Sequence, residues 1–316
     1  MEILKNPNYD FLGKARYLVP LSIAAIVAGF VMIGQGKLRY GVEFEGGTQV
    51  IAKFKAAPQV DRIRAAVEKV SPGAVIQSYG EPAANQVLIR LGAAGEGGAG
   101  EGELDTSAKR VLDSLASSYP ENPVVEHSSE IVGPVVGAEL RRKAIWLTVL
   151  GLLFQLIYIA VRFKGGVWGV GAVVACIHDV LFCLAFLCFF GYEITLNVIA
   201  ALLTLVGYSV NDTIVIFDRV RENLKQRRKD AIARILNDSV NQTLTRTLIS
   251  NGTTFLAVLG LYLFGGEVLA GFGFTMVVGI LVGTYSTIYI AAPLVAWWAG
   301  RRQTGAGAVA TAKAAL

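Results

Sequence analysis

The stretch of sequence that decides the fold is ITLNVIAALLTLVGYSVNDTIVIF, at residues 194–217. It is mostly apolar, and as a helix it exceeds the about 20 residues needed to cross the roughly 30 Å hydrocarbon core of a bilayer. One carboxylate, Asp212, nevertheless lies inside it. A charged side chain at that depth costs about 2.5 kcal/mol or more, so it needs a partner, water or a shifted pKa. The stretch therefore predicts a membrane-spanning helix that carries an ionisable group.

Five further apolar runs are long enough to span a membrane, at residues 18–34, 144–161, 167–190, 240–264 and 268–298. The chain is 53% hydrophobic and 17% charged, whereas soluble domains carry about 25% charged residues. The first run is short enough for a signal peptide, but the runs that follow favour an uncleaved anchor. The last run is too long for one straight span, so its start is expected to tilt or to lie at the interface. We predict an α-helical membrane protein with six spans.

The positions of Lys and Arg predict the orientation. With the N-terminus inside the cell, 15 basic residues fall in the inner segments, and the two short outer loops contain none. The inner segments are 5–16, 162–164, 219–234 and 301–313. The short outer loops are 191–193 and 265–267. This bias places both termini in the cytoplasm. Topology and anionic membrane lipid then account for the net charge of +5, and no nucleic-acid binding is predicted.

The chain is expected to have four parts. They are a cytoplasmic N-terminus with the first span (1–36), an external domain (37–143), five spans with a basic cytoplasmic loop at 218–239 (144–298), and a cytoplasmic tail (299–316). The sequence VGPVVG at 132–137 joins the external domain to the second span. Either a turn-rich hinge or a plain linker fits this segment.

The external domain alternates between strand-like and helix-like hydrophobic periods. Strands are expected at 47–55, 74–79, 86–91 and 123–132, helices at 59–70 and 104–119, and a flexible glycine linker at 92–103. The order β-α-β-β-α-β is that of a ferredoxin-like α+β sheet. His127 is the one histidine of this domain, and we interpret it as structural or exposed rather than as a ligand.

Three charged residues lie inside the apolar runs, namely Asp179, Asp212 and Arg246, and His178 precedes the first of them. Asp212 and Arg246 each lie six residues from the inner end of a run, so both are expected roughly 9 Å into the membrane and could meet if their helices are neighbours. Asp179 is expected near the middle of the bilayer. A carboxyl held between desolvation and a nearby cation can take up and release a proton.

Polar neighbours accompany these groups, and several interpretations stay open. Tyr208 and Asn211 belong to one helical stripe, and Ser209 is expected to share the face of Asp212. Asp212 could instead be a static packing residue, Arg246 could extend to the interface, and His178–Asp179 could be a buried structural pair. In the last span, Gly279 and Gly283 allow close helix packing, and interhelical hydrogen bonding is favoured for the polar run Thr284, Ser286 and Thr287.

Signs of enzymatic chemistry are absent from the sequence. The three cysteines, Cys176, Cys183 and Cys188, fall in one apolar run and predict neither a disulfide framework nor a metal site. No GxSxG, HExxH or P-loop pattern occurs. We predict no catalytic residue, no cofactor and no metal.

The sequence resembles the SecF family, the membrane subunits of bacterial SecD–SecF protein-export complexes. The resemblance is carried by GYSVNDTIVIFDRVREN (207–223), GVEFEGGTQV (41–50), VGPVVGAEL (132–140), ACIHDV (175–180), SVNQTLTRTL (239–248), LYLFGGEVLAGF (261–272) and GTYSTIYIAAP (283–293). It implies an RND-like six-span bundle with a periplasmic ferredoxin-like domain in the bacterial inner membrane. It also implies pairing with SecD, association with the SecYEG channel and YajC, and use of the proton motive force to promote late stages of preprotein export.

The resemblance also assigns residues. The Asp of the NDT element and the Arg of the TLTRT element, here Asp212 and Arg246, are tied to proton passage in the family, and a further Asp would come from SecD. His178, Asp179, Asn211, Ser209 and Tyr208 would then support this relay or the packing around it. The external motif GxDFxGG corresponds to Glu43, Phe44, Gly46 and Gly47, with Glu43 where the family usually has Asp.

Two other functions remain open at this point. A small-molecule exporter of the RND type usually has twelve spans in one chain, whereas six are predicted here. A purely structural subunit that stabilises SecD would need the bundle but not its ionisable groups.

Overall fold

The computed structural model describes residues 7–79, 82–92, 101–163, 166–227 and 230–298. Six helices of these residues are long and apolar enough to cross a membrane, as predicted. They include α1 (Phe11–Gly34), α5 (Pro134–Phe163), α6 (Gly166–Phe190), α7 (Leu196–Gln226), α8 (Ile232–Phe264) and α9 (Gly266–Ser286). The sixth span continues from α9 through a π-helical segment (Thr287–Ala291) to residue 298.

Several helices extend beyond the apolar runs that predicted them. α1 begins at Phe11, where the Asp10 side chain caps it by accepting from the Gly13 amide at 2.9 Å. Most of the segment 218–239, predicted as a basic cytoplasmic loop, is helical, because α7 continues to Gln226 and α8 already begins at Ile232. The apolar pattern marks only the part of a helix that lies in lipid, whereas backbone hydrogen bonding continues into water wherever the side chains are polar.

The sheet domain has the predicted order of elements. These are β2 (Gly47–Phe54), α3 (Val60–Glu68), β3 (Val75–Tyr79), β4 (Gln86–Gly92), α4 (Glu101–Ser118) and β5 (Val124–Val132). The strands form one antiparallel sheet in the order β3-β4-β2-β5, with the two ends of the chain segment on neighbouring strands. Alternate side chains of β2, including Val50, Ala52 and Phe54, are buried against α3 and α4. Of the predicted glycine linker at 92–103, residues 93–100 lie outside the described residues, whereas Gly92 ends β4 and residues 101–103 already belong to α4.

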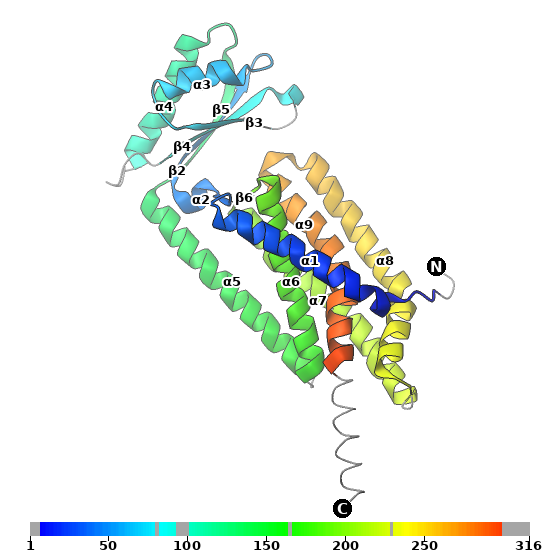
Figure 1. The fold of residues 1–316 in the computed structure, drawn as a ribbon. Coiled ribbons are helices and arrows are strands. Elements are labelled where there is room, and N and C mark those ends of the chain that lie inside the picture. The colour runs from blue at the N-terminus through cyan, green and yellow to red at the C-terminus, as the bar shows by residue number, and fades with distance from the viewer. Residues whose placement is uncertain (1–6, 80–81, 93–100, 164–165, 228–229, 299–316) are drawn as a thin grey trace, which may run out of the picture.

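The sheet domain lies at one end of the helix bundle (Figure 1), and short elements join the two. β1 (Arg39–Tyr40) pairs in parallel with β6 (Glu193–Ile194), which connects α6 to α7. The short helix α2 (Val42–Glu45) lies against α5, where an added Cβ at Gly137 would come within 3.0 Å of the Gly46 amide nitrogen. Residues 134–137, expected in a hinge or linker, form the first turn of α5.

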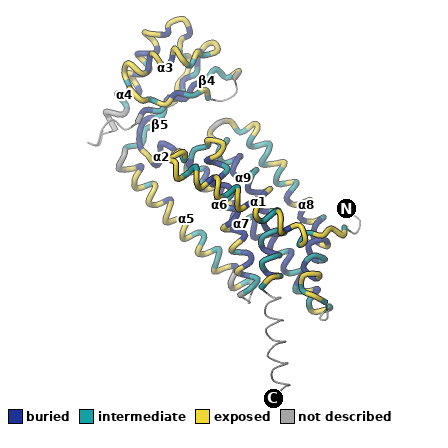
Figure 2. Tube along the Cα trace, in the orientation of Figure 1, coloured by how far each residue is buried: buried dark blue, intermediate teal, exposed yellow. Residues whose placement is uncertain are grey.

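Within the bundle, α6, α7 and α9 carry most of the buried residues, and α1, α5 and α8 lie around them (Figure 2). The outer helices expose large apolar side chains, such as Trp146, Leu147 and Phe154 on α5, as helices in contact with lipid do. The two glycines predicted for close packing face α7. An added Cβ at Gly279 would meet Leu205, and one at Gly283 would meet Ser209.

Candidate functional site

Asp212 lies on α7 with its side chain buried, and an amide on α8 holds it. The Asn251 Nδ2 group donates one hydrogen bond to Asp212 Oδ2 and another, at 2.5 Å, to Thr284 Oγ1 on α9. The Tyr208 hydroxyl, one turn before Asp212, donates to Asn251 Oδ1 at 2.9 Å. An amide has two N–H donors and an acceptor oxygen, and in Asn251 all of them are used. This amide therefore connects three helices to the carboxylate.

Arg246 does not form a salt bridge with Asp212. Among the described residues no ion pair within 4.0 Å involves Arg246, whose side chain is exposed on α8. It still lies within electrostatic range of the Asp212 carboxylate. Residues five apart in a helix differ by about 140° around its axis, so Asn251 and Arg246 cannot face α7 equally. Arg246 and Asp212 therefore interact through the electrostatic field of the guanidinium group rather than by direct contact.

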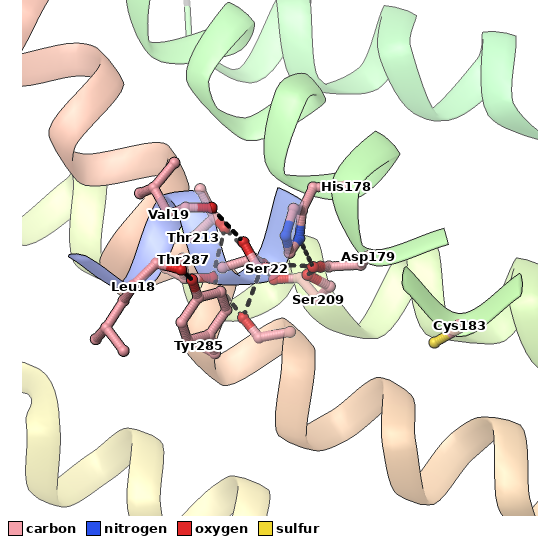
Figure 3. Close-up of polar contacts among 12 residues, drawn as sticks. Leu18, Val19, Ser22, His178, Asp179, Cys183, Ser209, Thr213, Tyr285 and Thr287 are labelled. Carbon is pink, nitrogen blue, oxygen red and sulfur yellow. Dashed lines mark hydrogen bonds and ion pairs between the residues drawn. The ribbon is translucent and has the colours of Figure 1, made fainter. Parts of the chain in front are cut away.

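A second polar centre surrounds Asp179 on α6, a residue that is 1% exposed. Its Oδ2 atom accepts hydrogen bonds from Ser209 Oγ on α7 at 2.6 Å and from Ser286 Oγ on α9 at 2.9 Å. Its Oδ1 atom lies 3.2 Å from His178 Nδ1. Figure 3 shows this convergence of α6, α7 and α9. Ser209, which the helical pattern placed with Asp212, therefore belongs to the Asp179 centre.

The polar run of the last span links both centres to their surroundings. Besides the contacts of Thr284 and Ser286, Thr287 Oγ1 lies 2.9 Å from Thr213 Oγ1, next to Asp212 in the sequence. The prediction of interhelical hydrogen bonds for this run is confirmed. Thr287 begins the π-helical segment, a distortion that is frequent at functional sites. The Tyr285 hydroxyl donates to the Leu18 carbonyl of α1 at 2.7 Å, so α1 is also tied to this region.

The structure redistributes the candidate residues. His178, Asp179 and Ser209 form one centre, Asp212 and Tyr208 the other, and Asn211 is exposed beside them. Asn251 was not among the sequence candidates, although it is the central residue of the Asp212 network. The only sequence signal was an amide inside an apolar run, and a single amide does not reveal which helix it faces.

The external motif occupies the junction between sheet domain and bundle. Phe44 is buried, and Gly46 and Gly47 have φ angles of 74° and 134°, which side chains other than glycine rarely adopt. Glu43 is half-buried at a cleft of about 540 Å³. Burial raises the pKa of Glu43 above its usual value of 4.5, and the charges of Glu130 and Glu193 raise it further.

An ion pair crosses the same junction. Arg90 on β4 bonds through Nη2 to the carboxylate of Glu193 on β6, and the two side chains are 13% and 18% exposed. Arg90 Nη1 also lies 3.5 Å from the Tyr40 carbonyl on β1. The sheet is thereby fastened to the connection between α6 and α7, the two helices that carry the buried acids.

Comparison with known proteins gives concordant results. The family described as "Protein export membrane protein SecD/SecF, C-terminal" matches residues 112–301. The protein translocase subunit SecF of Calditerrivibrio nitroreducens is 42% identical over 93% of this chain and 96% of that protein. SecF of Gemmatimonas aurantiaca is 40% identical over 95% of this chain and 90% of that protein.

Similarity extends to a longer protein as well. Protein translocase subunit SecDF of Thermus thermophilus is 38% identical over 95% of this chain, which spans 40% of that protein. A crystal structure of SecDF from Thermus thermophilus, described as a translocon-associated membrane protein, superposes with a TM-score of 0.80 at 34% identity. The superposition covers 93% of this chain and 39% of the SecDF chain.

Proposed function

This chain belongs to the SecD/SecF family of protein-export membrane proteins, and on that premise we propose that it works as the SecF-type subunit of the Sec translocase with Asp212 as its proton-binding group. Its relatives of matching length are translocase subunits, and a transport role follows. The fused SecDF relative supports SecD as the partner that supplies the other part of the membrane assembly.

The observation that carries the proton-coupling proposal is the contact between Asp212 and Asn251. Asn251 donates to the ionised carboxylate, and Arg246 acts on it through the field. A hydrogen bond to a charged acceptor is stronger than one to a neutral acceptor, so protonation of Asp212 weakens its hold on Asn251. Because the same amide bonds Tyr208 and Thr284, a change at Asp212 reaches α7, α8 and α9 together.

The junction with the sheet domain connects protonation of Asp212 to the domain that would contact the substrate. α7 begins directly after β6, which carries Glu193 and pairs with β1. Repacking of α7 would therefore shift β6 and its partner β1, which join the bundle to the sheet domain. The transmembrane potential is worth about 2.3 kcal/mol per charge per 100 mV, enough to bias two states that differ by a few kcal/mol.

The proposal includes an orientation and an assembly. The Lys and Arg bias supports cytoplasmic termini and a periplasmic sheet domain. In this arrangement the sheet domain would contact preprotein emerging from SecYEG, with SecD and YajC in the same complex. No catalytic residue or cofactor takes part, because the energy comes from the proton gradient.

The decisive experiment replaces Asp212 with Asn in the complete complex in sealed vesicles, and measures completion of preprotein transport with and without an imposed proton gradient. We expect the gradient-dependent part of transport to be lost and the gradient-independent part to remain. The matched control is Asp218→Asn, because Asp218 pairs with Arg162 near the end of α7 and is 42% exposed.

This comparison also separates the rival functions. A purely structural subunit predicts unchanged gradient-dependent transport in Asp212→Asn while the complex stays assembled. A small-molecule exporter of the RND type predicts that the vesicles accumulate a small substrate without SecYEG.

A further inference from the structure

The centre around Asp179 contains an atom that the proposed function does not use. His178 is 7% exposed, and its Nε2 atom is buried without a hydrogen-bond partner among the described residues. Its ring lies between Phe182 and Tyr285, with centroids 5.9 Å from each. A buried polar atom without a partner is rare and costs free energy, so it calls for an explanation.

The hydrogen bonds of Asp179 restrict where a proton can be added. Oδ2 already accepts from the hydroxyls of Ser209 and Ser286, so a proton on Oδ2 would displace one of the two serines. Between Oδ1 and His178 Nδ1, which are 3.2 Å apart, there is room for one shared proton. The lone pair of Nε2 is therefore the position at which a proton can be added while all three contacts of Asp179 are kept.

The charge of the Asp179 centre explains why a proton would bind at His178 Nε2. With Nε2 unprotonated and the shared proton on Nδ1, the centre carries one negative charge. Among the ion pairs of the described chain, Asp179 has no Lys or Arg partner, and its one basic partner is His178, which is a cation only when both ring nitrogens are protonated. The titratable groups nearby are the thiols of Cys176 and Cys183 on α6, the phenol of Tyr285 on α9, and the phenol of Tyr289 in the π-helical segment, which lines the same cavity as His178. None supplies a positive charge, and α7 adds Asp212 three residues after Ser209.

We propose that His178 Nε2 is a second proton-binding position in the bundle and that its protonation neutralises the buried Asp179 centre. This proposal deepens the proposed function and rests on it for its role in transport. A proton from water forms a bond to the Nε2 lone pair and later returns to water. In the protonated state the shared proton can lie on either Nδ1 or Oδ1, and the centre is neutral in both cases.

The geometry also indicates what this proton controls. In the unprotonated state an uncompensated charge strengthens the bonds that Ser209 and Ser286 donate to Asp179, and these bonds hold α7 and α9 against α6. Neutralisation weakens them. Ser286 directly precedes the π-helical segment of the last span, and Ser209 lies one turn before Asp212 and Thr213. Both proton positions would therefore act on the same α7–α9 contact.

The test observes the ring nitrogens directly. The chain has two histidines, His127 and His178, and His127 is exposed on β5. The chain is labelled with ¹⁵N-histidine, assembled with unlabelled SecD in lipid vesicles, and studied by solid-state NMR across a pH series. The His127→Asn variant removes one set of signals and thereby assigns the other to His178, even if variants at position 178 do not assemble.

We expect the Nε2 signal of His178 to change from unprotonated to protonated as the pH falls. In Asp179→Asn, which removes the carboxylate that stabilises the added proton, His178 is expected to stay unprotonated over the same range. A His178 ring whose protonation does not change in the wild-type complex would overturn the proposal.

Transport supplies the functional readout. His178→Asn retains an N–H donor near the position of Nδ1 but has no Nε2, so it is expected to assemble and to shift the pH profile of gradient-dependent transport. A merely structural role would leave that profile in place, and an unchanged profile in an assembled complex would overturn the transport role. If Asp212→Asn keeps gradient-dependent transport while His178 titrates as expected, the assignment of Asp212 fails and the second proton position stands.

Discussion

Asn251 on α8, rather than Arg246 on the same helix, makes the direct contact with the Asp212 carboxylate on α7, by donating a hydrogen bond to it. A salt bridge in a membrane interior favours the ionised acid strongly, because separating the charges there is costly. An amide donor with a cation at longer range leaves both protonation states of the acid accessible. The arrangement therefore suits the proton-binding role that we propose for Asp212.

Removal of the Asn251 amide should affect both stability and coupling. Asn251→Leu leaves the buried Asp212 carboxylate without its donor and breaks the contacts to Tyr208 and Thr284. Loss of a hydrogen bond to a charged group costs about 1.5–3 kcal/mol. We expect the free energy of unfolding in mixed micelles to fall by about that amount. Gradient-dependent transport should also fall.

The matched control is Asn197→Leu. Asn197 lies on α7, and its amide makes an exposed 3.2 Å bond to the Val268 carbonyl. A cost of about 1 kcal/mol or less is expected there. Equal effects of the two substitutions would show that Asn251 has no special relation to Asp212.

The ion pair between Arg90 and Glu193 should determine how firmly the sheet domain is held. Arg90→Met leaves Glu193 largely buried without its cation, and breaking a buried pair costs about 3–5 kcal/mol. We expect the lower end of this range, because both side chains keep some exposure. Hydrogen exchange should increase at residues 39–45 and 193–194 but not within the sheet.

Two comparisons make this result specific. The exposed pair of Arg62 with Glu121, at 53% and 73% exposure, is a control expected to be worth about 1 kcal/mol or less. The charge exchange Arg90→Glu with Glu193→Arg should restore part of the protection. If hydrogen exchange in Arg90→Met is the same as in the wild type, the pair does not fasten the domain.

Glu43 predicts how the junction responds to pH. Burial raises the pKa of Glu43 above 4.5, so the folded junction binds a proton more tightly than the unfolded chain does. The folded state then loses stability as the pH rises from 4.5 through the raised pKa, because the buried carboxylate must ionise. Hydrogen exchange at residues 42–45 should accordingly increase with pH beyond the intrinsic rate. Glu43→Gln should abolish this excess and leave a flat profile, whereas an unchanged dependence would show that Glu43 is not its origin.

The close approach of α1 to α6 gives a packing prediction. An added Cβ at Gly29 would collide with the Ala185 Cβ, and with the Ala185 Cα at 2.6 Å, so Gly29→Ala must push the helices apart. Overpacking of this kind costs about 1–3 kcal/mol. We expect lower thermal stability in detergent and a weaker contact of Tyr285 with the Leu18 carbonyl of α1.

The control substitution lies on the same helix. An added Cβ at Gly34 has no atom within 4 Å, so Gly34→Ala should be neutral or slightly stabilising. If the two substitutions have the same effect, the contact between Gly29 and Ala185 does not limit the approach of α1 to α6.

Much of the architecture could be predicted because it depends on local periodicity. The six spans, the strand and helix order of the sheet domain and the close packing at Gly279 and Gly283 all leave repeating patterns in the sequence. The ends of α7 and α8 could not be predicted, since a polar helix in water lacks the apolar signal that marks a span. The role of Asn251 was missed because a single amide has no period.

What the sequence by itself determined is the class of the molecule and the identity of its buried acids. Apolar runs and isolated charges are properties of the chain alone, because the cost of placing a residue in lipid depends on that residue's own chemistry. Which groups face those acids was decided only by the tertiary structure. The rotation of α8 turned Asn251 rather than Arg246 toward Asp212, and the close approach of α6, α7 and α9 brought Ser209 and Ser286 to Asp179. Hydrogen bonds require contact within about 3 Å, and such contacts between distant segments exist only once the helices have packed.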